Sequence, residues 1–522
     1  MRWAGSESIQ QVFEERVENT PLAPSCLSDD RGATFLQTNE DANRLAHCLR
    51  SAGIGPGDFV GVCMDNSPEL PATLLGVVKS GAAFVGLDPS HPGRRHLEIL
   101  ADTGCRALIA DPATGDWNPY PGLKLVAKDA RLADFHTHNP ECRAGPDDPF
   151  QVVYTSGSTG RSKGVLLSQR SFVKKLEWMQ QWSPFERDDV LLMHRSISLS
   201  VGTWDCFMGP LTGLPTVVMR RQRLYHPGAF YSILRAHGIS YLFASPPLIQ
   251  EVLKQAELDP SPDLKLKLAT SSGERLPDST IRRWMDVFPN VPILDVYGAS
   301  EYSSAMVFDV GADVRDGAGR RRGREATNTR VFILNEDLSP AAPGEPGEIC
   351  ISGAHMALGY LNDPVLTARK FVRNPFNKGS RLYRTGDTGR RHEDGSIELI
   401  GRNGEIVKIN GMRVGLAEIE DALAAHEAIR KSIVVPVGDP PRLLAFFVAD
   451  VDLTKLELRK HLMERLPLHM IPSFFVRRQR LPKTLAGKLD RQKLKGDAAV
   501  IARNTGRRAS NSRDLGGSRR SS

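Results

Sequence analysis

Strand and helix patterns alternate along much of the chain, and this alternation restricts the fold more than any other feature of the sequence. Short runs of β-forming residues at 58–64 and 82–85 alternate with stretches of helical periodicity at 39–52, which starts at Asn39, and at 67–81 and 91–103. Consecutive parallel strands need a crossover, which is usually a helix. We therefore predict the α/β class, with parallel sheets covered by helices.

The pattern changes at about residue 325. Segments rich in β-formers with Pro and Gly turns, at 329–334, 347–352 and 396–400, predict a small β subdomain. A polar break follows at 401–405, and the sequence beyond it has its own α/β pattern. We therefore predict a large N-terminal domain over residues 1–403, a small C-terminal α+β domain over 404–495, and a disordered basic tail over 496–522.

The composition argues against several classes of protein. Of the formal net charge of +7, residues 503–522 contribute +5, which leaves +2 for the rest and argues against a nucleic-acid-binding body. No run of about 18 apolar residues is present, and residues 1–10 have no apolar core, so we expect no membrane partner and a cytoplasmic location. The seven cysteines form no Cys-x-x-Cys pair, which argues against disulfides and structural zinc.

A glycine- and hydroxyl-rich loop follows the strand predicted at 152–154. Residues 155–164 contain three glycines, five hydroxyl side chains and one lysine, Lys163. Glycines let backbone N–H groups approach an anion, and the hydroxyls and the ammonium add donors and charge. A polyphosphate is the favoured ligand, although a Ser/Gly-rich surface turn has a similar composition. The Walker A pattern is excluded, because Ser162 stands at its second glycine and Gly164 follows the lysine.

Strands predicted at 240–244, 266–270 and 292–297 each end in a short polar loop. Ligands of α/β sheets bind beyond the carboxyl ends of the strands. We therefore expect one crevice to collect the three loops.

Residues 154–164 resemble the nucleotide-binding signature of the adenylate-forming enzymes, a superfamily of acyl-CoA ligases, luciferases and nonribosomal peptide synthetase adenylation domains. Further segments resemble motifs of the same superfamily in the same order, namely 296–301, 383–390, 401–414 and 481–491. The segment 78–92 resembles the peptide synthetase branch, and the chain is most similar to stand-alone adenylation domains of that branch. The resemblance covers residues 9–495 and implies a large nucleotide-binding domain with a small mobile lid.

The resemblance implies an ATP site with Mg²⁺. Asp387 would accept hydrogen bonds from both ribose hydroxyls, Tyr297 would stack on adenine, and Arg402 would reach the ribose. Glu301 would hold Mg²⁺ on the phosphates, as a hard oxygen ligand for a hard cation. The other residues implied in nucleotide binding are Thr155, Ser156, Gly157, Ser158, Thr159, Gly160, Gly273, Glu274, Asp295, Gly298 and Ser300.

Three lysines are implied in catalysis. Lys488, on a loop of the small domain, would bridge the substrate carboxylate and the α-phosphate. Lys163 belongs to the glycine-rich loop, and Lys408 is a candidate for contacts in a second domain pose. Asn403 and Gly404 would form the hinge, where the superfamily commonly has aspartate and where glycine can also absorb a large change in φ and ψ.

The implied reaction has two steps. A carboxylic or amino acid attacks the α-phosphate of ATP to give acyl-AMP and pyrophosphate, and a thiol then takes the acyl group. The peptide synthetase features favour a phosphopantetheine carrier protein in trans as the acceptor. Free CoA, in an acyl- or aryl-CoA ligase, is the alternative. A degenerate nucleotide-binding module is disfavoured, because the implied chemical groups are all present.

The implied acid pocket departs from the amino-acid pattern at one position. The aspartate that normally pairs with an α-ammonium falls on Ser200, and a serine cannot neutralise an ammonium. We therefore expect a hydroxy, keto, aryl or otherwise modified acid, or an amino group anchored elsewhere, with Asp205 as a displaced anchor if the register slips. The aligned pocket positions are Ser200, Val201, Trp204, Ala244, Thr270, Ser272, Val296, Ser304 and Ala305.

Overall fold

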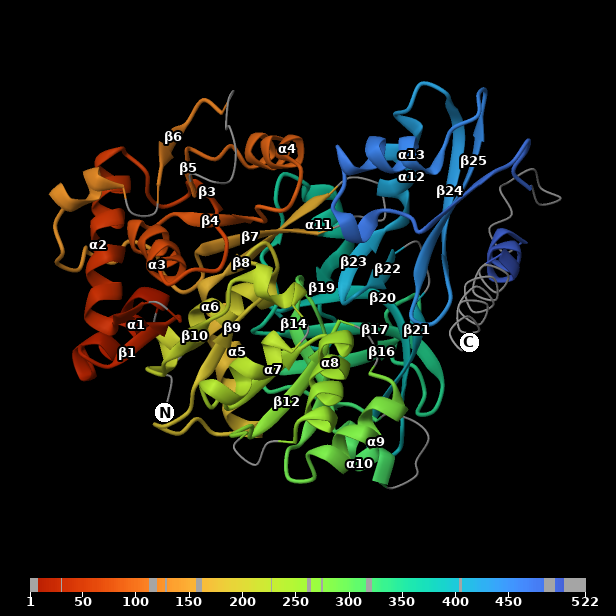
Figure 1. Cartoon of the computed structure of the whole chain (residues 1–522). Helices are drawn as coiled ribbons and strands as arrows, with labels where there is room; N and C mark the ends of the chain where they lie inside the picture. Colours follow the sequence, from red (N-terminus) through yellow and green to blue (C-terminus); the bar gives the residue numbers. More distant parts are fainter. Residues whose placement is uncertain are drawn as a thin grey trace, which may run out of the picture. The chain divides into compact units, whose positions relative to one another are not determined.

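The computed structural model divides the chain into two compact units (Figure 1). It describes residues 8–29, 31–111, 120–126, 129–155, 162–226, 228–260, 264–273, 276–315, 322–402, 406–482 and 493–501. The first unit comprises the described parts of Met1–Pro89, His96–Thr155 and Lys163–Asn403. The second comprises those of Ser90–Arg95, Ser156–Ser162 and Gly404–Ser522.

A seven-stranded sheet carries the glycine-rich segment. Its order is β18-β8-β7-β4-β3-β5-β6, and all pairs are parallel except β18 with β8 and β8 with β7. The strands are β3 (Phe59–Cys63), β4 (Ala83–Leu87), β5 (Ala107–Ala110), β6 (Leu123–Leu125), β7 (Pro149–Thr155), β8 (Lys163–Ser168) and β18 (Gly359–Tyr360). Helix α2 (Phe35–Ser51) precedes β3, and the helices between the strands of the sheet are α3 (Leu70–Ser80) and α4 (Gly93–Thr103).

The helix predicted at 39–52 begins earlier than the periodicity indicates. Helix α2 starts at Phe35, because the Thr34 side chain accepts from the backbone of Gln37 and the Gln37 side chain accepts from the backbone of Thr34. This reciprocal cap satisfies two backbone donors at the helix start. Asn39, the expected first residue, is instead buried in the second turn.

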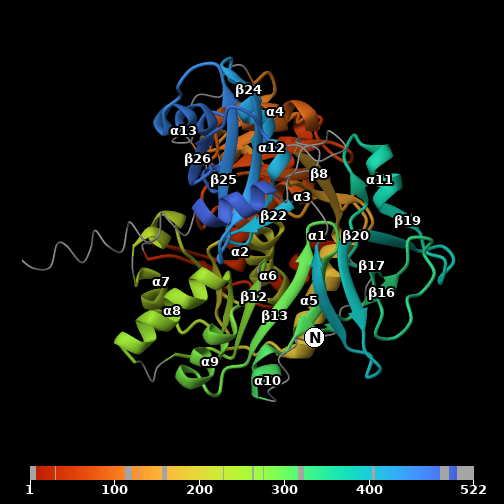
Figure 2. The same ribbon diagram turned by 90° about the vertical axis from the view of Figure 1, so that its right-hand side faces the viewer.

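A second sheet has the order β11-β12-β13-β14-β15, and its first three strands are parallel. Their carboxyl ends therefore meet at one edge, as the sequence predicted. Figure 2 shows α7, α8 and α9 on one side of this sheet. These elements are α7 (Ala229–Ala236), α8 (Pro246–Leu258), α9 (Asp278–Val287), α10 (Val310–Arg315), β11 (Tyr241–Ala244), β12 (Leu268–Ser272), β13 (Ile293–Ala299), β14 (Ser303–Phe308) and β15 (Arg324–Glu325).

Two further sheets complete the first unit. The four-stranded sheet, in the order β2-β1-β10-β9, consists of β1 (Pro24–Leu27), β2 (Gly32–Thr34), β9 (Leu191–Met193) and β10 (Thr216–Val218), with α1 (Ile9–Asn19), α5 (Gln169–Trp182) and α6 (Ser200–Thr212) in the same unit. The antiparallel β subdomain consists of β16 (Thr329–Leu334), β17 (Pro346–Gly353), β19 (Phe371–Arg373), β20 (Arg381–Arg391) and β21 (Ile397–Arg402), with α11 (Pro364–Lys370) before β19. The predicted α/β class with a β subdomain is confirmed.

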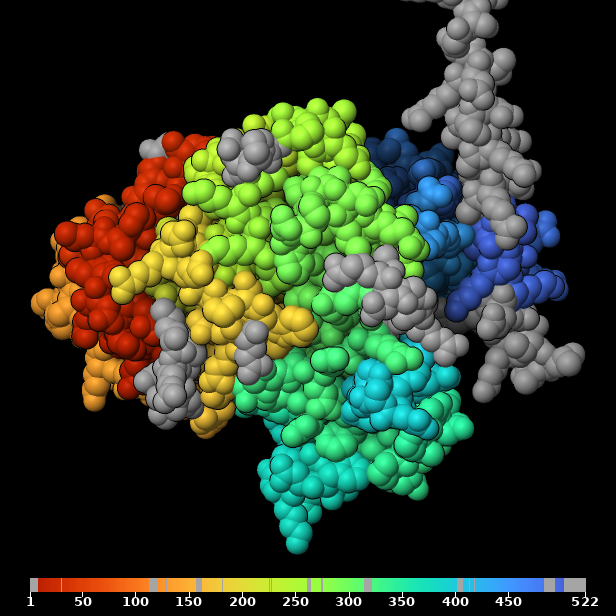
Figure 3. Space-filling view, turned by 90° about the horizontal axis from the view of Figure 1, so that it is seen from below, coloured from red at the N-terminus to blue at the C-terminus, as the bar shows by residue number. Residues whose placement is uncertain are grey.

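One apolar core runs through the first unit. It extends in sequence from Ile9 to Ile397 and includes residues of all four sheets. In the space-filling view, the red, yellow and green residues of this unit form a continuous surface (Figure 3). The sheets therefore form one body that can hold side chains from distant segments in fixed positions. No helix in the described part of the chain is long and apolar enough to cross a membrane.

The second unit is built on the strands β24, β25 and β26. Alternate residues of β24 belong to different clusters: Val434 packs in the core with α12 and α13, whereas Ile433 and Val435 pack in a cluster with Leu494 and Ala498. Its elements are β22 (Ile406–Ile409), β23 (Met412–Gly415), α12 (Leu416–Ala424), β24 (Ile429–Val437), β25 (Arg442–Ala449), α13 (Lys455–Met463) and β26 (Phe474–Arg477).

The start of the predicted tail is ordered. Residues 493–501 are helical, and burial of Leu494 and Ala498 against the sheet accounts for this. The disorder predicted from residue 496 onwards is therefore wrong for 496–501. Residues 502–522 lie outside the described residues.

Candidate active site

A β-hairpin closes the base of the glycine-rich loop. Strands β7 and β8 pair antiparallel up to Thr155 and Lys163, which are register partners. The pairing of β7 with β4 anchors this hairpin in the seven-stranded sheet. Lys163 is therefore held by a strand. The other loop residues that the sequence implied, Ser156, Gly157, Ser158, Thr159 and Gly160, lie outside the described residues.

Lys163 faces a buried carboxylate. Its ammonium nitrogen lies 3.8 Å from Oε1 of Glu301, whose side chain is 0% exposed. The Tyr360 hydroxyl donates to Glu301 Oε1 at 2.9 Å and accepts from Lys163 at 3.3 Å. Burial and the neighbouring carboxylate raise the pKa of Tyr360, so the phenol stays protonated and remains a donor. Strands β8 and β18 and the turn after β13 thus bring three functional groups together.

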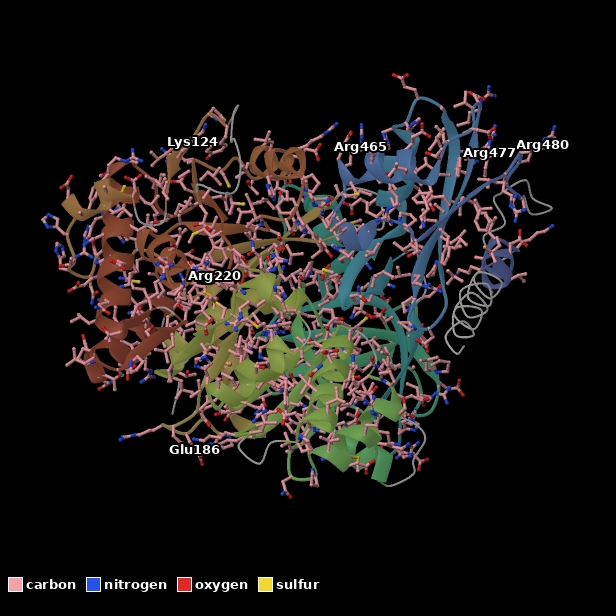
Figure 4. The ribbon with its side chains drawn as sticks, viewed as in Figure 1. Lys124, Glu186, Arg220, Arg465, Arg477 and Arg480 are labelled. Carbon is pink, nitrogen blue, oxygen red and sulfur yellow. The ribbon has the colours of Figure 1, made fainter. Side chains whose placement is uncertain are left out.

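The donor set around Glu301 fits Mg²⁺ bound together with a polyphosphate. Mg²⁺ usually takes one or two carboxylates and completes its shell with phosphate oxygens and water. Glu301 supplies a carboxylate, and Lys163 supplies a cation for the phosphates beside it. A separate acidic group consists of the exposed Glu186 and Asp188 and the buried Asp189, and Glu186 projects outward (Figure 4). Lys267 pairs with two of its three carboxylates, those of Glu186 and Asp189, with its ammonium 2.7 Å from Asp189 Oδ1.

Two residues implied by separate motifs are in contact. The Tyr297 hydroxyl donates to Asp387 Oδ2 at 2.5 Å, and both side chains are buried. Burial raises the pKa of Tyr297, and the nearby Tyr302 and Asp387 raise it further, so this phenol is also protonated. The register of β20 and β21 places Asp387 opposite Arg402, whose side chain lies outside the described part. The contact joins an aromatic ring and a carboxylate, the groups suited to a base and a ribose diol.

The turn between β13 and β14 requires glycine at position 298. A Cβ atom there would lie 1.9 Å from the carbonyl oxygen of Ser303. The register between the two strands shifts between Tyr297 and Gly298 at this turn, which also carries Ser300 and Glu301. Directly after the neighbouring strand β12, Gly273 has φ of 96°. Asp295 Oδ2 accepts from the backbone of Leu276 at 3.4 Å, and Glu274 lies outside the described residues.

A small cavity that is open to solvent lies beside Ser200 in the first unit. Its apolar wall is formed by Phe150, Leu167 and Phe172, and its polar wall includes Ser200 and Ser300. The remaining lining residues are Gln151, Ser171, Lys175, Ser303 and His355. Ser200 was predicted as a pocket residue, whereas the cation in the wall, Lys175, was not.

The other predicted pocket residues lie near the same structural elements. Trp204 is buried on α6, and its ring is 5.8 Å from that of Phe172. Val201 and Ser272 are partly buried. The remaining members of the predicted set are buried on β11 to β14, namely Ala244, Thr270, Val296, Ser304 and Ala305.

Asp205 is not an open anchor for an ammonium. Its buried carboxylate accepts from the Arg195 guanidinium through both oxygens, with Arg195 Nε 2.9 Å from Oδ2. The backbone N–H of Arg195 also donates to Oδ2 at 3.2 Å. Because this ion pair already satisfies the carboxylate, the displaced-anchor alternative is wrong.

Of the catalytic and hinge residues predicted at 403, 404, 408 and 488, the structure describes Lys408. Lys408 lies on β22, and its register partner on β23 is Arg413. Lys488, Asn403 and Gly404 lie outside the described residues. The catalytic and hinge roles of these residues therefore remain predictions.

The sequence analysis missed Tyr360 and Lys175. Tyr360 has no local signal, because its partners Lys163 and Glu301 are far from it in the sequence. Lys175 has one: it follows Phe172 by three residues and precedes Met179 by four, and both are buried on α5. A lysine on the apolar stripe of a helix indicates a charge that faces inward.

The fold and the site define an adenylate-forming enzyme. Residues 13–361 match the family model described as AMP-binding enzyme, and residues 418–488 match the one described as AMP-binding enzyme C-terminal domain. The chain therefore belongs to the AMP-binding enzyme family, and the predicted resemblance is confirmed.

Related proteins include large peptide synthases. The chain is 35% identical over 504 residues to bacitracin synthase 3 of Bacillus licheniformis, covering 96% of this chain and 8% of that protein. It is 34% identical over 508 residues to tyrocidine synthase 3 of Brevibacillus parabrevis, covering 94% of this chain and 8% of that protein. The chain thus spans less than a tenth of the length of these two relatives.

A solved structure supports the same comparison. An artificially fused adenylation–PCP di-domain nonribosomal peptide synthetase from Klebsiella oxytoca superimposes with a TM-score of 0.80 at 26% identity. The match covers 90% of this chain and 94% of that one. The likeness therefore extends over nearly all of the chain.

Proposed function

We propose that this chain activates a carboxylic acid with ATP as acyl-AMP and transfers the acyl group to the phosphopantetheine thiol of a carrier protein in trans. The observation that carries the proposal is the group formed by Lys163, Glu301 and Tyr360, which comes from three segments and suits a polyphosphate. The similarity to a solved adenylation–PCP di-domain supports a carrier thiol as the acceptor.

In the first step, a carboxylate oxygen of the acid forms a bond to the α-phosphorus, and the bond from phosphorus to pyrophosphate breaks. Both reactants are anions, so positive charge in the site stabilises the transition state. Lys163 supplies such a charge from a strand, and Lys488 supplies a second from its loop. When Mg²⁺ is bound, Glu301 holds it, and the ion neutralises phosphate charge.

Tyr297 and Asp387 orient the nucleoside. The Tyr297 hydroxyl donates to Asp387 and holds the carboxylate in place. The carboxylate can accept hydrogen bonds from a vicinal diol, and the tyrosine ring can stack on a base. In the second step the thiol loses its proton and attacks the acyl carbonyl carbon, and AMP leaves.

The first test is acid-dependent exchange of radiolabelled pyrophosphate into ATP. Lys488→Ala should lower the exchange rate by a factor of about 10² or more, because the loss removes charge that acts in the transition state. Lys460→Ala, an exposed lysine of α13, is the matched control and should leave the rate unchanged. Unchanged exchange in Lys488→Ala would contradict the mechanism.

The acceptor is tested separately. The enzyme is supplied with its activated acid and either free CoA or a phosphopantetheinylated carrier protein. Thioester on the carrier supports the proposal, whereas efficient thioester formation with CoA alone would assign the chain to the CoA ligases.

A further inference from the structure

Lys175 differs from an ordinary surface lysine in its surroundings. Its side chain lines the cavity beside Ser200, and its ammonium lies 4.6 Å from the centroid of the Trp204 ring. Among the residues that the structure describes, the ammonium has no hydrogen bond or ion pair. A cation at the face of an indole retains a partial interaction, but its hydrogen-bond donors remain available to a ligand.

The nearest carboxylate does not neutralise Lys175. Asp205 is held by the Arg195 guanidinium through both of its oxygens. That pair is neutral as a unit, so it does not compensate the positive charge of Lys175. Burial, with a further contribution from Arg195, lowers the pKa of Lys175 to about 7, which indicates a cation in need of a counter-ion.

The other polar groups of the cavity wall are uncharged and partly unsatisfied. The hydroxyls of Ser200 and Ser300 make no hydrogen bond to any described residue, and the buried Gln151 Oε1 has no hydrogen-bond partner in that part of the chain. The opposite wall is apolar, with Phe150, Leu167 and Phe172. A ligand group that enters the cavity would therefore meet an apolar wall on one side and hydrogen-bonding groups with a cation on the other.

We propose that Lys175 is a specificity-determining residue that binds a second carboxylate of the acid substrate, so that the enzyme activates a dicarboxylic acid rather than an α-amino acid. This inference rests on the proposed function of the site. A carboxylate is attracted to the Lys175 ammonium and can also accept from Ser200, whereas an α-ammonium would meet a like charge with no carboxylate to balance it.

A set of acids that differ only in the group at the α-carbon gives the sharpest test. Pyrophosphate exchange is measured with methylmalonate, lactate, pyruvate and alanine, and with the benzyl-substituted equivalents of each. We expect the malonates to have the highest kcat/KM. Preference for the amino, hydroxy or keto acids would overturn the proposal.

Variants at position 175 then separate recognition from a structural role. Lys175→Met should lower kcat/KM for the malonate by about 30-fold or more and change the values for the other acids by less than about threefold, because truncating one partner of a buried charge pair is costly. Lys175→Arg should restore part of the malonate activity. An equal loss with every acid would show a structural role and overturn the proposal.

The neighbouring lysine provides the control. Lys174 pairs with Glu177 on the same helix, at 2.5 Å, and does not line the cavity. Lys174→Met should leave all the acid preferences unchanged.

Failure of the proposed function gives a different result from failure of this inference. If no acid supports exchange, titration calorimetry of methylmalonate and alanine with the wild type and Lys175→Met still tests the cavity. Methylmalonate binding that is lost in Lys175→Met supports the inference. Absence of such binding, or equal binding by the two proteins, overturns it.

Discussion

Two lysines of the first unit, the buried Lys79 and the partly buried Lys175, have opposite surroundings. Lys79, at the end of α3, is 0% exposed, and its ammonium donates to the side chains of Glu14, Asn39 and Asn43 at 2.7, 2.6 and 2.7 Å and to Asn139 at 3.2 Å. Its acceptors come from helices α1 and α2 and from the loop before β7. The protein thus provides both the charge and everything that neutralises it.

Lys175 has an aromatic ring and an open cavity where Lys79 has a carboxylate and three amide oxygens. A buried charge costs free energy unless it is paired, so an ammonium without acceptors is unfavourable for stability alone. Lys79 therefore stabilises the fold, whereas the surroundings of Lys175 fit a ligand that supplies a hydrogen-bond acceptor.

The largest expected effect is a difference between the two lysines in how their substitution changes the free energy of unfolding. Lys79→Met should lower the free energy of unfolding by about 3 kcal/mol, because it removes the cation that pairs with Glu14 and leaves the amide oxygens of Asn39 and Asn43 without their donor. Lys175→Met should leave stability unchanged or raise it, because it removes an unpaired cation. Denaturant titration followed by tryptophan fluorescence measures both, and a large loss in Lys175→Met would remove the distinction.

The second expected effect is a pH dependence of the stability that arises from the titration of Lys175. Its pKa falls from the ordinary 10.5 to about 7 on folding, so between these values the unfolded chain binds more protons and stability rises with pH. The stability of the wild type relative to Lys175→Met should therefore increase by about 3 kcal/mol between pH 6 and pH 9.

The measurement is the same denaturant titration at the two pH values. Arg195, Asp205 and His355, the charged and titratable groups around Lys175, are present in both proteins and should largely cancel in the difference. A difference that is independent of pH would show that Lys175 has an ordinary pKa in the folded protein.

The smallest expected effect concerns the negative charge of Glu14, which pairs with the Lys79 ammonium. Glu14→Gln keeps an oxygen acceptor beside the ammonium and removes the negative charge, so it should cost about 1 kcal/mol of stability. Glu15→Gln, at a more exposed neighbouring carboxylate, should change stability by less than about 0.5 kcal/mol. Equal effects of the two substitutions would mean that the charge of Glu14 contributes little.

The sequence predicted the fold and much of the nucleotide side of the site. Alternating strand and helix patterns are local, so they indicated the α/β class without any tertiary information. The motifs that contain Lys163, Glu301, Tyr297 and Asp387 have residue types that suit phosphate, metal and ribose. The structure places these four side chains in two contacting pairs.

The acid side was harder to predict, because its decisive residue depends on which face of a helix is buried. Lys174 and Lys175 are adjacent and chemically identical, and only the packing of α5 directs one to Glu177 and the other to the cavity. The same holds for Asp205, whose availability depended on Arg195, a partner outside its helix. Pairings between distant segments are set by tertiary packing, which local patterns do not encode.

The hairpin of β7 and β8 has a consequence for protein engineering. Because the ladder runs up to Thr155 and Lys163, the two ends of the glycine-rich segment are fixed by the sheet. The residues between them can therefore be replaced as one cassette. Lys163 stays unchanged, while the hydroxyl residues and glycines of the segment are varied one position at a time.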